Sequence, residues 1–145
     1  MVAPEYGSPA GGVGRHVAEL ARRVAAAGHD VEVLTHGRVH HAGDTDEITV
    51  RHFPAPPAIG DYAVSPDLWA HLRIHGRGYD IVHAHGYRTL PALLASRAVL
   101  PHLVFTPHWH RAPATRARRL LHPVYRRLGV PAFDRADVVI CVSRA

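Results

Sequence analysis

The chain has 145 residues, enough for one domain with a core of its own, and 47 % hydrophobic residues argue against disorder. All 17 basic residues are arginines, and the net charge of +5 favours anionic partners such as phosphates, nucleotides or an acidic membrane surface. Aromatic residues make up only 7 % of the chain and are not interleaved with the arginines, so we expect no nucleic-acid partner.

Cysteine usage and apolar runs bear on where the protein works. Cys141 is the single cysteine, which excludes an internal disulfide and is typical of a reducing compartment. No apolar run approaches the roughly 20 residues that span a bilayer, and the first residues do not read as a signal peptide. We therefore expect a cytoplasmic protein.

The first strong pattern lies between residues 4 and 28, where a loop rich in Gly and Pro runs into a helical repeat. Apolar residues recur at helical spacing and predict a helix over 13–27 with one buried stripe. Gly28 follows directly, as glycine commonly does just past the last turn of a helix. A strand is predicted immediately afterwards, at 31–35.

The junction between loop and helix holds Gly11, Gly12 and Gly14. Glycines there let a phosphate approach the free N–H groups of the first helical turn, so the pattern predicts an anion site. A plain strand-to-helix turn explains the same residues equally well. A nicotinamide dinucleotide is disfavoured, because Val17 replaces the third glycine and no acidic residue ends the strand at Thr35.

The rest of the chain alternates strands and helices. In chain order we expect the end of a first strand at 1–3, a near-edge strand at 48–53, a helix at 66–75 capped by Ser65, a strand at 81–85, a helix at 89–99, a strand at 103–106, a basic and mostly helical stretch at 111–135 broken near Pro123 and again at Gly129–Pro131, and a strand at 137–142 buried on both faces.

This alternation predicts an α/β fold: a Rossmann-like, doubly wound, mostly parallel sheet with helices on both faces. Such folds bind ligands beyond the carboxyl ends of their strands. Three stretches should meet at that edge, namely the loop 4–14, the strand end 85–87 and the strand end 107–110.

Histidines mark two of these strand ends. His83 and His85 are two residues apart and so should point to the same face, while His108 and His110 follow the next strand. With 14 histidines in the chain, a structural role is the commoner explanation for any single one. His-x-His at a strand end also resembles a metal-hydrolase signature, but no acidic residue lies near it to complete a catalytic site.

The basic stretch carries Arg116, Arg119, Arg126 and Arg127, which can share one side of a helix. A solvated helix face is the simpler interpretation. The functional alternative is attraction to anionic lipid or to an acidic partner.

Four stretches together carry a family resemblance: PEYGSPAGGVGRHVAELARRVAAAGHDVEVLT, YDIVHAHGYRTLPALLA, VFTPHWH and ADVVICVSRA. In this order and spacing the chain resembles the N-terminal domain of retaining GT-B glycosyltransferases of family 4. The resemblance implies transfer of a sugar from a nucleotide-sugar to a sugar or lipid-linked acceptor, with retention of configuration and without a metal cofactor.

The resemblance also implies roles for individual residues. His108 would face the transferred sugar, and Gly11 and Gly12 would lie against the donor diphosphate. The glycine pattern at the helix start adds Gly14 to this predicted diphosphate site. The acceptor site would be shaped by Glu5, Tyr6, Arg15, His16, His85 and Tyr87.

The whole chain, 1–145, would then be the acceptor-side domain with a shortened first strand. The nucleotide-sugar domain of the family would lie outside this sequence, so the chain resembles a fragment that is inactive alone. A nucleotide- or phosphate-binding module without catalysis is the alternative, and a metal-dependent hydrolase is the less favoured one.

Overall fold

The computed structural model describes residues 1–7, 12–36, 48–55, 65–87, 89–108, 127 and 129–142. These residues form a six-stranded, entirely parallel sheet in the order β3-β2-β1-β4-β5-β6. The elements are β1 (Val2–Ala3), α1 (Gly12–Ala26), β2 (Val31–Thr35), β3 (Ile48–His52), α2 (Pro66–His75), the 3-10 turn η2 (Gly76–Gly78), β4 (Val82–His85), α3 (Leu90–Arg97), β5 (Leu103–Thr106) and β6 (Val138–Val139). The predicted fold class is confirmed.

The short strand β1 lies at the centre of the sheet, between β2 and β4. Val2 is in register with Leu34 of β2 and with Ala84 of β4. The chain winds from β1 outward in one direction to β3 and in the other direction to β6. The gap between β1 and β4 is therefore the topological switch point, where ligands bind in folds of this kind.

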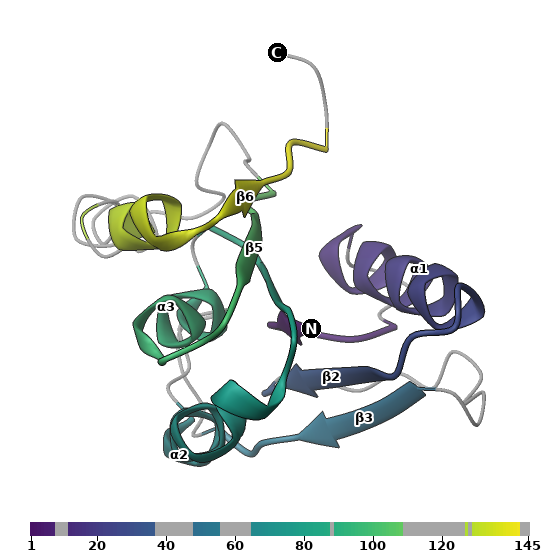
Figure 1. Cartoon of the computed structure of the whole chain (residues 1–145), viewed down its shortest axis with the longest axis horizontal. Helices are drawn as coiled ribbons and strands as arrows, with labels where there is room; N and C mark the ends of the chain where they lie inside the picture. The colour runs from purple at the N-terminus through teal and green to yellow at the C-terminus, as the bar shows by residue number, and fades with distance from the viewer. Residues whose placement is uncertain are drawn as a thin grey trace.

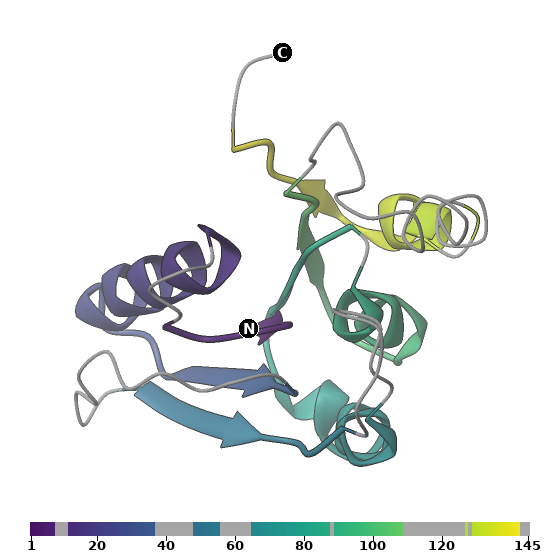
Figure 2. The same cartoon turned by 180° about the vertical axis from the view of Figure 1, so that it is seen from behind.

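Helices cover both faces of the sheet, as Figures 1 and 2 show from opposite sides. Helix α1 packs on one face, and α2, α3 and the helical residues 129–135 pack on the other. Successive side chains of each strand point to opposite faces of the sheet and so contribute to both hydrophobic cores. Ala3 and Val33 face α1, whereas Val2 and Leu34 face α3.

Helix α1 follows the pattern that predicted it. Its buried residues are Gly14, Val17, Ala18, Ala21 and Ala25, which form one stripe toward the sheet. The amide of Gly28 donates to the carbonyl of Ala25 over 2.8 Å and closes the last turn.

Helix α2 also begins and ends where the sequence predicted. The hydroxyl of Ser65 accepts a hydrogen bond from the amide of Leu68 over 3.3 Å, and Pro66 fills the first turn. The shorter helix α3 likewise carries Pro91 in its first turn.

Two expectations about the C-terminal part are wrong. Residues 129–135 are helical, so no break occurs at Gly129–Pro131. Glycine at position 129 allows the helix to pack closely on Tyr87, because a Cβ on Gly129 would come within 2.8 Å of the Tyr87 ring. Strand β6 is an exposed edge strand rather than one buried on both faces, with Val138 51 % exposed and Val139 40 % exposed. Among the described strands only β5 pairs with β6, so the apolar run 137–142 by itself did not determine burial.

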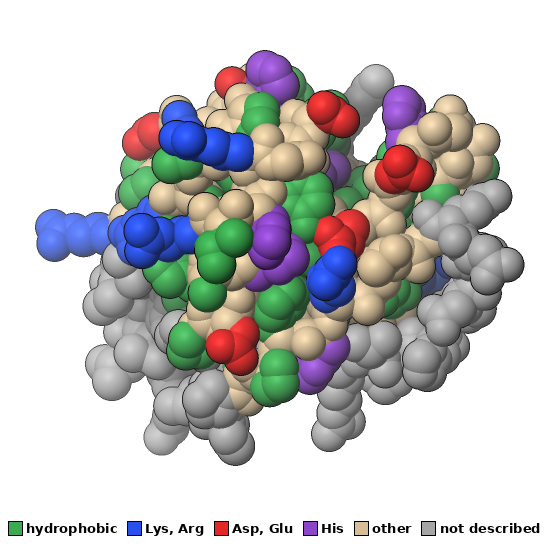
Figure 3. Space-filling view, turned by 60° about the horizontal axis from the view of Figure 1, so that its bottom comes forward, with side chains coloured by type: hydrophobic (Ala, Val, Ile, Leu, Met, Phe, Trp, Pro, Cys, Tyr) green, Lys and Arg blue, Asp and Glu red, His purple; other side chains and the backbone are tan. Residues whose placement is uncertain are grey.

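The described surface shows no segregation by charge on the face drawn in Figure 3, where acidic, basic and histidine side chains are scattered among hydrophobic ones. The predicted basic face rests on Arg116, Arg119 and Arg126, which lie outside the described residues. Among the described helices, none combines the length and apolar character needed to cross a membrane.

Candidate functional site

The carboxyl ends of β4 and β5 are held side by side beyond the strands themselves. The amide of Gly86 donates to Thr106 O over 2.9 Å, and the amide of Tyr87 donates to Pro107 O over 2.7 Å. Gly86 has φ +94°, and a Cβ on it would lie 2.7 Å from the side chain of Thr89. Glycine is therefore required at this turn, which ends β4 and turns the chain toward α3.

His83 and His85 share one face of β4, as their spacing predicted. Their ring centroids lie 4.1 Å apart, and both rings are on the α1 side of the sheet. His83 Nε2 lies 2.7 Å from the hydroxyl of Thr106 on the neighbouring strand, which fixes the ring of His83. His83 in turn supports the ring of His85 next to it.

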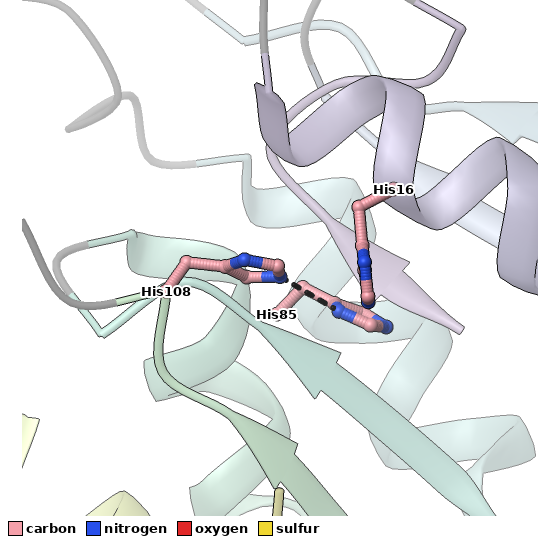
Figure 4. A group of neighbouring side chains, drawn as sticks. All are labelled: His16, His85 and His108. Atoms are coloured by element: carbon pink, nitrogen blue, oxygen red, sulfur yellow. Dashed lines mark hydrogen bonds between the residues drawn. The ribbon is translucent and has the colours of Figure 1, made fainter. Parts of the chain in front are cut away.

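Three histidines from separate segments meet at this edge, as Figure 4 shows: His16 from α1, His85 from the end of β4 and His108 after β5. We call them the edge cluster. His85 Nδ1 lies 3.3 Å from His108 Nε2, and the ring of His16 stands edge-on to both others, with centroids 4.9 Å from His108 and 5.8 Å from His85. One of these two nitrogens, His85 Nδ1 or His108 Nε2, must carry a proton and donate the hydrogen bond, and the other nitrogen accepts the bond.

Burial keeps the inner histidines neutral. His85 is fully buried, and this burial, with the nearby His83 and His108, holds the pKa of His85 far below its ordinary value. Burial likewise lowers the pKa of His83 to about 4. These rings therefore act near neutral pH as hydrogen-bonding groups and not as cations.

One nitrogen in the buried ring of His85 has no partner among the described residues. Its Nε2 is shielded from solvent and makes no hydrogen bond to the described residues. An unpaired buried polar atom costs about 1–3 kcal/mol. Such an atom at a topological switch point indicates a position where a ligand can supply the missing contact.

His108 has an unusual backbone. Its φ of +47° lies in the left-handed region, and it is the only non-glycine residue in the described part of the chain with this conformation. The conformation costs about 1–2 kcal/mol for an ordinary L-residue. Strain of this kind is found at functional sites, where the fold holds a side chain in one direction.

The start of α1 forms the second part of the candidate site. A Cβ on Gly12 would meet no atom within 4 Å, so the space in front of this residue is open. The amide of Gly14 is already paired, because it donates to Glu5 Oε1 over 3.4 Å. A phosphate that binds the amide of Gly14 must displace this carboxylate. Gly11 lies outside the described residues.

The residues predicted for the acceptor site do not all gather there. Glu5 lies at the start of α1, Arg15 is exposed on α1, and His16 and His85 are in the edge cluster. Two aromatic side chains lie in the cores instead: Tyr6 is 4 % exposed and packs on the α1 side, while Tyr87 is 8 % exposed and packs against Phe133 on the other side. Their hydrophobic bulk explains this burial.

Sequence reasoning missed two connections. It did not link His16 to the strand-end histidines, and it did not anticipate that Thr106 would hold His83. Strand alternation offered a signal for the second, because His83, His85 and Thr106 all belong to the α1-facing set. The competitor of His108, His110, lies outside the described residues.

The edge cluster is also the group among the described residues that could hold a metal ion. Each of its rings can offer one nitrogen, and these nitrogens lie within 4.8 Å of one another. It contains no carboxylate that could serve as a general base in metal-assisted hydrolysis.

Comparison with known protein families gives a match over most of the chain. Residues 10–145 match the sequence profile of the family described as Glycosyltransferase Family 4. No match to a curated protein was found. The matched region includes α1, the carboxyl ends of β4 and β5, and the whole edge cluster. The histidines that meet near the switch point therefore lie within the region that matches the family. The chain is a member of glycosyltransferase family 4.

Proposed function

We propose that this chain is the acceptor-side domain of a retaining glycosyltransferase, which transfers a sugar from a nucleotide-sugar to a sugar or lipid-linked acceptor. Membership of the family supports sugar transfer between a donor and an acceptor. The observation that carries the proposal further is the pairing of His85 with His108 at the carboxyl edge next to the switch point, where α/β folds bind their ligands.

In this proposal His108 contacts the transferred sugar. Its imidazole can donate a hydrogen bond to a sugar hydroxyl or accept one, and needs no charge to do so. His85 sets the direction of the His108 ring through the contact between their nitrogens. A polar group fixed in advance stabilises the transition state without paying for its own reorganisation, which is the property that electrostatic catalysis requires.

The donor diphosphate lies, in the same proposal, at the start of α1. The open space in front of Gly12 and the positive end of the helix dipole favour a phosphate there. The amide of Gly14 becomes available when Glu5 swings away, which frees that carboxylate for the acceptor. Gly11 would contribute to the same phosphate contact.

The partner of this site is a second, nucleotide-binding domain in the longer protein. Retaining transfer needs a closed cleft that positions both substrates and excludes water, and one domain supplies one wall of it. We further propose that transfer needs no metal cofactor, that the protein works in the cytoplasm, and that its basic stretch touches the anionic inner face of the membrane.

The test is turnover of the full-length enzyme on a panel of UDP- and GDP-sugars with simple sugar and lipid-linked acceptors. We expect transfer with retained anomeric configuration that a chelator does not abolish, and none from the 145-residue chain alone. An inverted product, or activity lost together with a stoichiometric metal, contradicts the proposal. Multiple turnover by the isolated chain contradicts the division of labour between two domains.

A further inference from the structure

The edge cluster has a geometry that sugar binding alone does not require. Three imidazoles converge from three separate segments, and their ring nitrogens lie within 4.8 Å of one another. His85 is fully buried at the bottom of the group, whereas His16 and His108 are partly exposed above it. Figure 4 shows the three rings next to one another, with the ring of His85 between those of His16 and His108 and the sheet.

We propose that His16, His85 and His108 bind a divalent transition-metal ion of the Zn²⁺ class, and that this ion inhibits the enzyme. Zn²⁺ lies about 2.0–2.1 Å from imidazole nitrogens, so two ligands of a tetrahedral site are about 3.3 Å apart. His85 Nδ1 and His108 Nε2 are separated by 3.3 Å. The ring of His16 must move inward by no more than about 1.5 Å to complete the same spacing, because the ligand nitrogens of the three residues lie within 4.8 Å of one another.

The orphaned nitrogen of His85 is a second, independent sign of a ligand. When Nδ1 carries the ring proton and donates it to His108, the buried Nε2 keeps a lone pair that no described group uses. A metal ion that binds Nε2 uses this lone pair and removes the cost, whereas an ion bound through Nδ1 leaves the proton on a buried Nε2; the orphaned nitrogen therefore favours Nε2 as the ligand atom. The neighbouring His83 is already held by Thr106 and so remains outside the ligand set.

The donor set decides which ions fit. Three neutral imidazoles suit Zn²⁺, Cu²⁺, Ni²⁺ or Co²⁺, whereas Mg²⁺ and Ca²⁺ prefer oxygen ligands, which the cluster does not contain. The chain should therefore select transition metals over the alkaline-earth ions.

Inhibition follows from the shared use of His108, and this part rests on the proposed function. An imidazole whose lone pair is on a metal cannot accept a hydrogen bond at that nitrogen, and its ring is locked in the metal's geometry. Because the ion displaces the contact with His85 that sets the direction of the His108 ring in the proposed function, it disturbs the contact with the sugar and lowers turnover.

Metal binding is tested on the 145-residue chain by calorimetric titration with Zn²⁺ and by the visible absorption of Co²⁺, which reports tetrahedral coordination. We expect one site of high affinity, weakened by about tenfold or more in His16→Gln and in His108→Gln, and no binding of Mg²⁺. The matched control is His75→Ala, because His71 and His75 form another close pair, with ring centroids 4.7 Å apart on α2.

Circular dichroism of each variant verifies folding, and the two partly exposed positions keep the test independent of the buried His85. The site is refuted if the wild-type chain binds no Zn²⁺, or if His75→Ala weakens binding as much as His16→Gln and His108→Gln do. In the full-length enzyme Zn²⁺ should suppress turnover and a chelator should restore it. Tight binding at the cluster without suppression refutes the inhibition, while absence of any transferase activity refutes the proposed function and leaves the binding result standing.

Discussion

Two polar groups that contain histidine are built in opposite ways in this domain. The edge cluster has no carboxylate, includes the left-handed residue His108 and contains His85 Nε2, which is unpaired within the part of the chain that the structure describes. The second group, which we call the base network, consists of His71, Tyr79, Glu32 and Arg51, and it joins α2 to β2 and β3.

Every hydrogen bond of the base network has a defined direction. Arg51 Nε and the hydroxyl of Tyr79 both donate to the carboxylate of Glu32. The hydroxyl of Tyr79 donates its only proton to Glu32. The contact of 2.9 Å with His71 must therefore be a hydrogen bond that His71 Nε2 donates to the hydroxyl oxygen of Tyr79. A network satisfied in this way stabilises the fold and offers nothing to a ligand.

This difference shows that the hydrogen-bond partners of a histidine say more about its role than its presence in the sequence does. Both groups lie in a chain with 14 histidines, so composition alone does not separate them. The unsatisfied and strained group lies at the switch point, where ligands bind, and the satisfied group lies elsewhere. Substitutions in the two groups should therefore affect different properties.

The largest expected effect is that of His108→Ala on catalysis. In the full-length enzyme this change should lower kcat by roughly two to three orders of magnitude, the size seen when a preorganised polar contact is lost. Nucleotide affinity should remain within about twofold of the wild type, because the proposed nucleotide-binding domain is a separate domain that lacks His108. Steady-state kinetics with the best donor measure both quantities.

The control comes from the base network. His71→Ala should reduce stability and leave kcat within about twofold of the wild type. Normal kcat in His108→Ala, combined with complete loss in His110→Ala, would place the sugar contact two residues further along the chain.

The next effect concerns Gly12. Because a Cβ there meets no atom of the domain within 4 Å, Gly12→Val should fold normally and obstruct only a ligand. We expect kcat/KM for the donor to fall by about tenfold or more as the diphosphate loses its close approach. Gly78→Val is the matched control, since a Cβ on Gly78 also meets nothing within 4 Å. Equal kinetics in the two variants would exclude the diphosphate from the start of α1.

Stability should respond to the base network and not to the site. Tyr79→Phe removes the hydroxyl that joins His71 to Glu32, and should lower the free energy of unfolding by about 1–2 kcal/mol. Urea titration of the 145-residue chain measures this loss. Unchanged stability together with impaired sugar transfer would mean that the two groups have been assigned the wrong way round.

The smallest effect is a pH dependence. Burial pushes the pKa of Glu32 up, but hydrogen bonds from Tyr79 and Arg51 outweigh it and leave that pKa below its ordinary value of 4.5. A carboxyl with a depressed pKa stabilises the fold above pH 4.5, and this contribution disappears as the pH falls through the folded-state value. Burial also lowers the pKa of His71, so protonation of the unfolded state already reduces stability below pH 6.5.

Urea titrations from pH 7 to pH 3 should therefore show a steeper loss of stability for the wild type than for Glu32→Gln. The difference between the two should arise mainly below about pH 4.5. Parallel curves for the two proteins would show that Glu32 titrates alike in the folded and unfolded states.

Much of the fold could be predicted from the sequence because local signals agreed with the tertiary structure. Strands 31–35 and 103–106 and helix 66–75 have the predicted bounds, since periodicity, capping by Ser65 and flanking prolines all indicated the same elements. The predictions failed where tertiary contact decided the outcome. Gly129 reads locally as a helix break, yet it serves close packing on Tyr87.

The candidate site was predictable in part. Strand spacing and parallel topology place His85 and His108 at one edge, and the structure brings them within 3.3 Å of each other. The left-handed backbone of His108 and the pairing of Glu5 with Gly14 have no local sequence signal, because both depend on how separate segments meet. Tyr6 and Tyr87 show the same limit, since an aromatic residue beside a strand end can serve the core as well as the site.

The most direct test of the central claim follows the histidine side chains of the full-length enzyme by NMR during titration with the nucleotide-sugar that supports the fastest turnover. We expect the ring resonances of His108 and His85 to shift with the donor concentration, while those of His71 and His75 stay in place. Shifts confined to His71 and His75, or saturation with donor that leaves His108 and His85 unmoved, would contradict the assignment of the edge cluster as the sugar-binding site.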